Sequence, residues 1–153
     1  MLADDASRLA EALLSQHLPG AGWRFGFDRA VRRAGACHHA DRRITLSKHL
    51  VARAEPDEVR DVLLHEIAHA LAGHGAGHGP RWRAACARLG HAGTRLHDRP
   101  IAEERAAWVG SCPAGHEHRR FRRPGRPVSC GACSRSFSRA ALITWRRIDP
   151  ATA

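Results

Sequence analysis

Residues 59–82 read VRDVLLHEIAHALAGHGAGHGPRW, and the interpretation of the whole chain begins from this stretch. Its apolar residues Val59, Leu63 and Ile67 recur every four residues, which is the spacing of one face of an α-helix. The helix is predicted to begin near Pro56, because proline at the first helical position, followed by two acidic residues, favours a helix start. The stretch therefore predicts a long amphipathic helix.

His65 and His69 stand four residues apart in this helix, in the pattern His-Glu-x-x-His. Side chains at positions i and i+4 of a helix lie one above the other, about 6 Å apart along the axis, so both imidazoles can bind one zinc ion. Glu66 flanks the metal, where a general base can take a proton from the attacking water. The chain holds 12 histidines, so a chance match must be weighed, but its place inside an amphipathic helix favours a catalytic zinc site.

Two histidines beyond this helix are candidates for the third zinc ligand. His74 lies five residues past His69, which in a continuing helix would turn it about 140° away from the metal-binding face. His78 follows a glycine-rich bend, so a loop can carry it back to the metal, and we favour His78. The metzincin pattern is excluded, because it needs glycine and histidine where this chain has Ala72 and Gly75.

The rest of the N-terminal region predicts a small α+β domain over residues 1–105. Apolar residues at helical spacing predict a first helix between Leu2 and Leu13, and a further helix is expected after Pro80. Alternating apolar and polar residues predict three short strands, expected in one small antiparallel sheet, at residues 23–27, 30–37 and 42–47.

Two runs, LLHEIAHA at residues 63–70 and GHGPRW at residues 77–82, resemble the SprT-like (Spartan-related) zinc metalloprotease family. The resemblance covers roughly residues 2–90, and its specific part is residues 59–82. It implies a compact zincin-like α+β fold and proteolysis of DNA-bound or DNA-crosslinked proteins. By position it implies zinc ligands and a catalytic acid/base at His65, His69, His78 and Glu66.

The family resemblance also implies a zinc ribbon at the C-terminus, and residues 106–153 offer a candidate for a ribbon-like β hairpin. Cys130 and Cys133 form a Cys-x-x-Cys knuckle, whose two thiolates can reach one tetrahedral ion. Cys112 precedes them without a second cysteine at its side, so a histidine would complete a second, structural zinc site. We favour His116 over His118 for this role. Alternatively, the ribbon persists as a hairpin that has lost its metal.

The C-terminal region is basic, with ten arginines against four acidic residues beyond position 100, in a chain of net charge +10. Guanidinium groups neutralise phosphates and interleaved aromatic rings can stack on unpaired bases, so this region is expected to bind DNA. The residues expected to contact DNA are Arg119, Arg120, Arg122 and Arg123. Two plainer readings are a solvated loop between two strands and the arginine-rich codon usage of a GC-rich genome.

The sequence thus predicts a zinc metallopeptidase that acts on proteins or peptides. An alternative from another class is a nucleic-acid-binding zinc protein with mainly structural metal sites. Glu66 favours the enzyme, because a structural site has four protein ligands and no use for a carboxylate beside an open position. Another zinc hydrolase, such as an amidase, would share the motif.

The composition also suggests a compartment. No run of 18 apolar residues predicts a membrane span, and the start Met-Leu-Ala-Asp-Asp lacks the basic and apolar regions of a signal peptide. The five cysteines are an odd number, which argues against a disulfide framework. We therefore expect a cytoplasmic protein with no membrane partner, which can associate with the nucleoid if it binds DNA.

Overall fold

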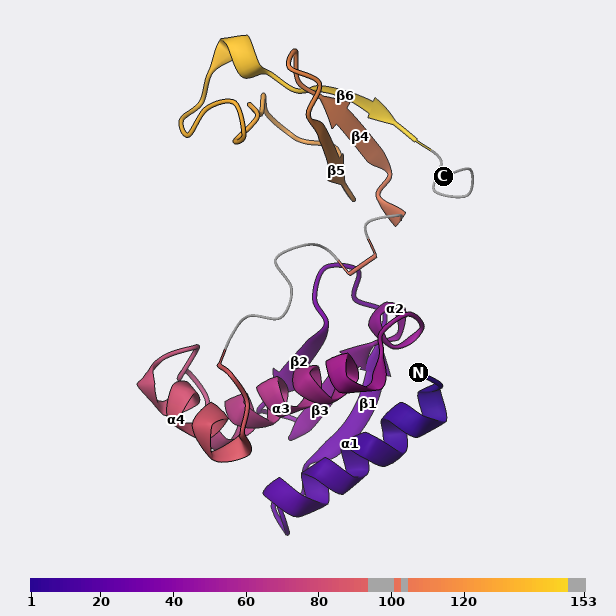
Figure 1. The fold of residues 1–153 in the computed structure, drawn as a ribbon, viewed down its shortest axis with the longest axis vertical. Coiled ribbons are helices and arrows are strands. Elements are labelled where there is room, and N and C mark those ends of the chain that lie inside the picture. The colour runs from indigo at the N-terminus through magenta and orange to yellow at the C-terminus, as the bar shows by residue number, and fades with distance from the viewer. Residues whose placement is uncertain (94–100, 103–104, 149–153) are drawn as a thin grey trace. The chain divides into compact units, whose positions relative to one another are not determined.

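The computed structural model describes residues 1–93, 101–102 and 105–148, and the chain divides into two compact units. The first unit is Met1–Ile101 and the second is Ala102–Ala153 (Figure 1). The domain boundary predicted from the sequence was residue 105. Each unit has its own sheet.

The first unit holds helices and strands in a mixed α+β order, as the sequence predicted. Its helices are α1 (Ala3–His17), α2 (Lys48–Val51), α3 (Pro56–Ala72) and α4 (Pro80–Leu89). Its strands are β1 (Arg24–Asp28), β2 (Gly35–His38) and β3 (Arg43–Ser47). No helix in the described ranges is long and apolar enough to cross a membrane.

The sheet of the first unit is mixed, so the prediction of an antiparallel sheet was wrong in one of its pairings. The strand order is β1-β3-β2, with β2 antiparallel to β3 but β1 parallel to β3. The register sets Phe25 opposite Ile44 and Phe27 opposite Leu46, so both strands turn their apolar residues to the same face. The alternation of apolar and polar residues predicts which side chains share the apolar face, but it does not show which strands pair or in which direction.

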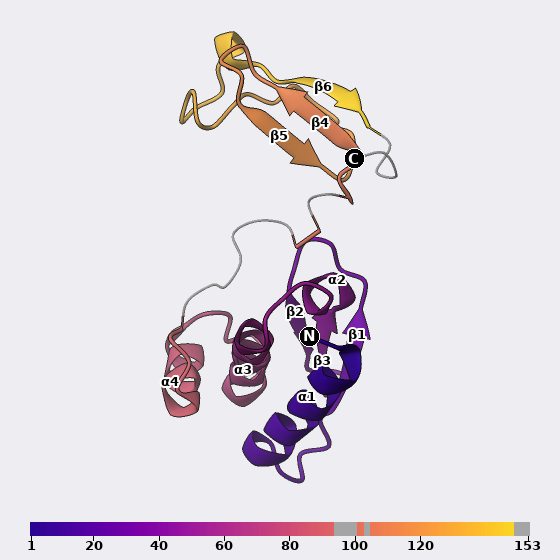
Figure 2. The same ribbon diagram turned by 45° about the vertical axis from the view of Figure 1, so that its right-hand side comes forward.

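Helices α1 and α3 cover the apolar face of this sheet, and Figure 2 shows α3 between the sheet and α4. Val59, Leu63 and Ile67 of α3 are all at most 1% exposed. Burial of one such side chain contributes about 1.5–3 kcal/mol. The core therefore fixes the position of α3 more strongly than helix propensity could, and this is the helix that carries the His-Glu-x-x-His pattern.

The second unit is a three-stranded antiparallel sheet of order β5-β4-β6. Its elements are β4 (Trp108–Ser111), β5 (Glu117–Arg120), the short 3-10 helix η2 (Arg139–Ala141) and β6 (Thr144–Arg147). The sequence predicted a ribbon-like hairpin here without placing its strands; β4 and β5 form a hairpin, and β6 adds a third strand that was not predicted. The sequence of β6 has three polar residues and one tryptophan, so it lacks the apolar alternation by which strands are found.

Candidate metal centres

Three imidazole rings meet beside α3. His65 and His69 come from successive turns of α3, and His78 comes from the loop that precedes α4. The Nε2 atom of His78 lies 3.2 Å from Nε2 of His65 and 3.3 Å from Nε2 of His69. The structure thus brings together the three residues that the sequence analysis selected as zinc ligands, and we call them the triad.

The spacing of these nitrogens fits a zinc ion. Ligands at the usual Zn–N distance of 2.0–2.1 Å and tetrahedral angles are separated by about 3.3–3.4 Å. A ring nitrogen carries either one proton or one lone pair, so a nitrogen that faces two others cannot satisfy both by hydrogen bonding. A single divalent cation in their midst satisfies all three. The donor set of the triad therefore fits zinc.

The loop between α3 and α4 returns His78 to the metal-binding face. Helix α3 ends at Gly73, whose φ of 84° is readily adopted only by glycine, and Pro80 starts α4. Arg81 links the two helices, because its Nε donates to the carbonyl oxygen of Ala72 at 2.9 Å and its Nη2 donates to the same atom. His74, the other candidate for third ligand, lies against His39 instead.

The electrostatic setting keeps His69, one member of the triad, in its metal-binding form. Burial, together with the charges of the neighbouring His78 and His39, lowers the pKa of His69 to about 4. His69 is therefore neutral at pH 7, and a neutral imidazole is the form that binds a metal.

Glu66 lies on α3 next to His65 and is 8% exposed. Burial raises the pKa of its carboxyl group from 4.5 to about 7. The charge of Asp28 raises it too, whereas Arg33 and a hydrogen bond from the main chain of Cys37 act in the opposite direction. A carboxyl group with this pKa can both take up and release a proton near neutral pH.

Strand β2 approaches Glu66 at Gly35, a residue that the sequence analysis did not single out. A Cβ atom at position 35 would lie 3.0 Å from Cγ of Glu66, 3.1 Å from Cγ1 of Val62 and 2.9 Å from the carbonyl oxygen of Thr45. Real Cβ atoms essentially never approach another heavy atom to 2.9 Å and rarely to 3.0–3.1 Å, so glycine is the residue that lets the strand come this close. A glycine inside a strand pattern was the available signal.

The side chains of two further residues, Trp82 and His91, pack against the triad. The indole Nε1 of Trp82 faces the carbonyl oxygen of His65 at 3.5 Å, and its ring lies 4.5 Å from that of His78. The His91 side chain is fully buried, accepts a hydrogen bond at Nδ1 from the Gly93 amide at 3.0 Å and directs Nε2 toward Asp61 at 3.6 Å. No role was predicted for His91 from the sequence, because nothing in the sequence shows that the end of α4 packs against α3.

A second cluster lies in the other unit and joins Cys112, His116, Cys130 and Cys133. The Sγ atoms of Cys112 and Cys133 are 3.7 Å apart, and Nδ1 of His116 lies 3.3–3.6 Å from the three sulfurs. Tetrahedral zinc with Zn–S of 2.3 Å separates two sulfurs by about 3.8 Å and a sulfur from a nitrogen by about 3.6 Å. The cluster therefore fits a structural zinc ion.

Local turns assemble this cluster. The β4–β5 turn is closed by the amide of Gly115, which donates to the carbonyl oxygen of Cys112 at 2.9 Å. The knuckle is closed by the amide of Cys133, which donates to the carbonyl oxygen of Cys130 at 3.2 Å. His116 is the histidine in the cluster, whereas the ring of His118 lies 6.5 Å from that of Trp145.

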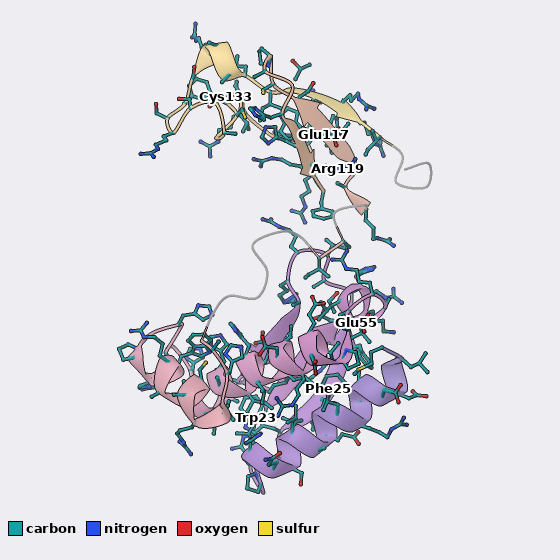
Figure 3. The ribbon with its side chains drawn as sticks, viewed as in Figure 1. Trp23, Phe25, Glu55, Glu117, Arg119 and Cys133 are labelled. Atoms are coloured by element: carbon teal, nitrogen blue, oxygen red, sulfur yellow. The ribbon has the colours of Figure 1, made fainter. Side chains whose placement is uncertain are left out.

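The arginines expected to bind DNA do not form one uniform group. Arg119 is on β5 and pairs with Glu117 at 3.0 Å; both are labelled in Figure 3. Arg120 lies over the ring of Trp145 at 5.5 Å, and Arg123 lies over the ring of Trp108 at 5.7 Å. Arg122 belongs to the same run, just beyond β5.

A family model described as the SprT-like family matches residues 5–102. The chain belongs to the SprT-like family. The matched range takes in α3 and the triad and ends where the second unit begins, so the Cys112 cluster lies outside it. Searches of curated proteins and of solved structures find no match. Membership of the SprT-like family and the two donor clusters are consistent with a metal-binding protein.

Proposed function

We propose that this SprT-like protein is a zinc-dependent metallopeptidase, with zinc held by His65, His69 and His78 and with Glu66 as the acid/base. The observation that supports this most directly is a buried carboxyl group beside a cluster that, among the residues the structure describes, has three donors. A structural zinc site normally has four protein ligands, whereas a catalytic one keeps a position open for water or substrate.

In this proposal each group has a defined task. When bound, zinc polarises the scissile carbonyl group and acidifies the attacking water. Glu66 takes the proton from that water and delivers it to the leaving amine, which a carboxyl group with a pKa of about 7 can do near neutral pH. Strand β2 is an edge of its three-stranded sheet and borders Glu66, so an extended peptide can pair with it.

The substitution Glu66→Gln tests the proposal. It keeps the shape of the side chain but cannot accept the proton, so cleavage of an unfolded, fluorescently labelled protein should fall by about 100-fold or more. Zinc per chain, measured by elemental mass spectrometry on protein without a histidine tag, should stay the same. Glu11→Gln, an exposed change on α1, is the matched control. Cleavage retained by Glu66→Gln would exclude the assigned mechanism.

We further propose that the second unit binds DNA, and that the peptidase thereby acts on DNA-bound or DNA-crosslinked proteins. Support comes from a hollow of about 310 Å³ lined by Trp108, Trp145, Arg123, Arg126 and the residues between these arginines. Guanidinium groups over indole rings offer both a phosphate contact and a stacking surface for bases.

Fluorescence anisotropy with a labelled single strand and a labelled duplex tests DNA binding across a series of salt concentrations. The double variant Arg120→Ala/Arg123→Ala should bind at least tenfold more weakly and lower the salt slope by about two. The variant Arg32→Ala/Arg88→Ala, which removes the same charge from the first unit, should bind nearly as wild type does. An equal loss of DNA affinity in both variants would show that binding depends on net charge alone, and it would exclude this surface as the DNA-binding site.

A further inference from the structure

We propose that Cys37, His39 and His74 form an accessory metal site beside the triad, which takes a divalent cation with affinity for sulfur and nitrogen, such as zinc supplied in excess. Occupancy of this site is proposed to slow the peptidase. The slowing depends on the function proposed above, whereas the binding of the metal does not.

The first pair of donors already has the spacing that a metal requires. Sγ of Cys37 and Nε2 of His39 lie 3.7 Å apart, close to the separation of about 3.6 Å between a sulfur and a nitrogen on tetrahedral zinc. Cys37 lies on β2 and His39 directly follows it, two residues on, so both side chains leave the strand toward the same side. That side faces α3, because a Cβ at Gly35, two residues before Cys37 on the same strand, would lie 3.0 Å from Cγ of Glu66.

His74 supplies the third donor from the loop between α3 and α4. Its ring centroid lies 5.7 Å from that of His39 in an edge-on arrangement, whereas the rings of the triad are 4.8–5.2 Å apart. The donors of the accessory site do not all lie within 4.8 Å of one another, as those of the triad do. Glycines on both sides of His74, at φ of 84° and 77°, leave the short backbone segment free to close this gap.

The surroundings favour a cation. Burial and, to a smaller extent, the negative charge of Glu66 raise the pKa of the Cys37 thiol to about 12. A bound divalent ion would be attracted by the same carboxylate and would take the thiol as thiolate. Trp23, labelled in Figure 3, packs edge-on against His39 at 5.8 Å and holds that ring in place.

The accessory site would act on catalysis through two contacts. The main chain of Cys37 hydrogen-bonds to Glu66, and His39 is close enough to His69 to affect its pKa. A cation bound here would hold the Glu66 carboxylate and weaken it as a base. It would also occupy the end of β2, the strand along which a peptide is proposed to lie. Since the donors must move together to bind, the accessory site is expected to fill only after the triad and the Cys112 cluster.

Equilibrium dialysis against free zinc, followed by elemental mass spectrometry, tests the binding on the full chain. Wild type should take up one zinc ion beyond its resident metal as free zinc rises. Cys37→Ser and His74→Ala should each weaken that uptake at least tenfold and keep the resident metal, and His49→Ala, on α2, should leave it unchanged. No extra zinc in wild type, or unchanged uptake in both variants, would overturn the proposal.

Peptide cleavage at the same zinc concentrations tests the effect on activity. Wild type should be slowed as the extra zinc binds, and Cys37→Ser and His74→Ala should resist this inhibition at least tenfold better than wild type or His49→Ala. Extra zinc that binds without slowing cleavage would overturn the regulatory part alone. If no form cleaves the substrate, the proposed peptidase function fails, while the dialysis result still decides the accessory site.

Discussion

The buried ring of His91 packs edge-on against the ring of His65, with 5.6 Å between centroids and 81° between planes. His91 follows α4, and Asp61, toward which its Nε2 points, lies one helical turn before His65 on α3. A residue from the end of one helix therefore fixes a proposed zinc ligand on another. Replacing a residue in the layer around the metal ligands commonly lowers the metal affinity by about 10- to 100-fold.

We expect His91→Ala to weaken zinc binding to the triad by about 10- to 100-fold, because the His65 ring loses the surface against which it packs. His91→Phe should restore part of that loss, since it keeps a ring but not the polar contacts to Asp61 and Gly93. Competition with a chromophoric chelator measures the affinity. If both variants bind zinc as wild type does, the His91 ring has no part in holding His65.

The sequence could predict which three histidines come together in the triad but not the residues that pack around them, and the reason is physical. His65 and His69 share a helix, so their spacing alone places them together. His78 required only the inference that glycines allow a chain reversal. His91, Gly35 and Arg81 act across contacts between elements, and nothing in a local pattern shows which elements meet. The parallel pairing of β1 with β3 escaped prediction for the same reason.

Gly35→Ala should lower both stability and catalysis. The added methyl group meets Glu66, Val62 and a carbonyl oxygen at 2.9–3.1 Å, and such overpacking costs about 1–3 kcal/mol. The side chain best able to move is Glu66, so cleavage should fall at least tenfold in protein that is still folded and zinc-loaded. Gly125→Ala is the control, because nothing lies within 4 Å of a Cβ there. Unchanged cleavage by Gly35→Ala would show that the position of Glu66 tolerates the shift.

The metal-free protein should lose stability as pH rises from about 5 to 8 through the ionisation of Glu66. The pKa of this carboxyl group is about 7 when folded and 4.5 ordinarily, so between these values the folded state binds more protons than the unfolded state. Stability therefore falls with rising pH, by about 3 kcal/mol in all.

Urea unfolding in the presence of a chelator, at pH 5 and pH 8, measures this loss. The metal-free Glu66→Gln variant lacks the titrating group and should show a smaller fall, with the difference from wild type giving the share of Glu66. The lowered pKa of His69 affects both proteins alike and cancels in the comparison. Parallel pH profiles for the two proteins would show that Glu66 titrates at its ordinary pKa.

Arg81→Met should release the loop that carries His78. The guanidinium group donates from both Nε and Nη2 to the carbonyl oxygen of Ala72 at the end of α3, and methionine keeps the apolar stem without either donor. Hydrogen bonds that involve a charged group contribute about 1.5–3 kcal/mol, so thermal unfolding should occur at a lower temperature. Zinc affinity should fall as well, because His78 would no longer be held against His65 and His69. Arg88→Met, an exposed change on the same helix, is the matched control. A lower unfolding temperature with unchanged zinc affinity would mean that Arg81 stabilises the fold but does not position the third ligand.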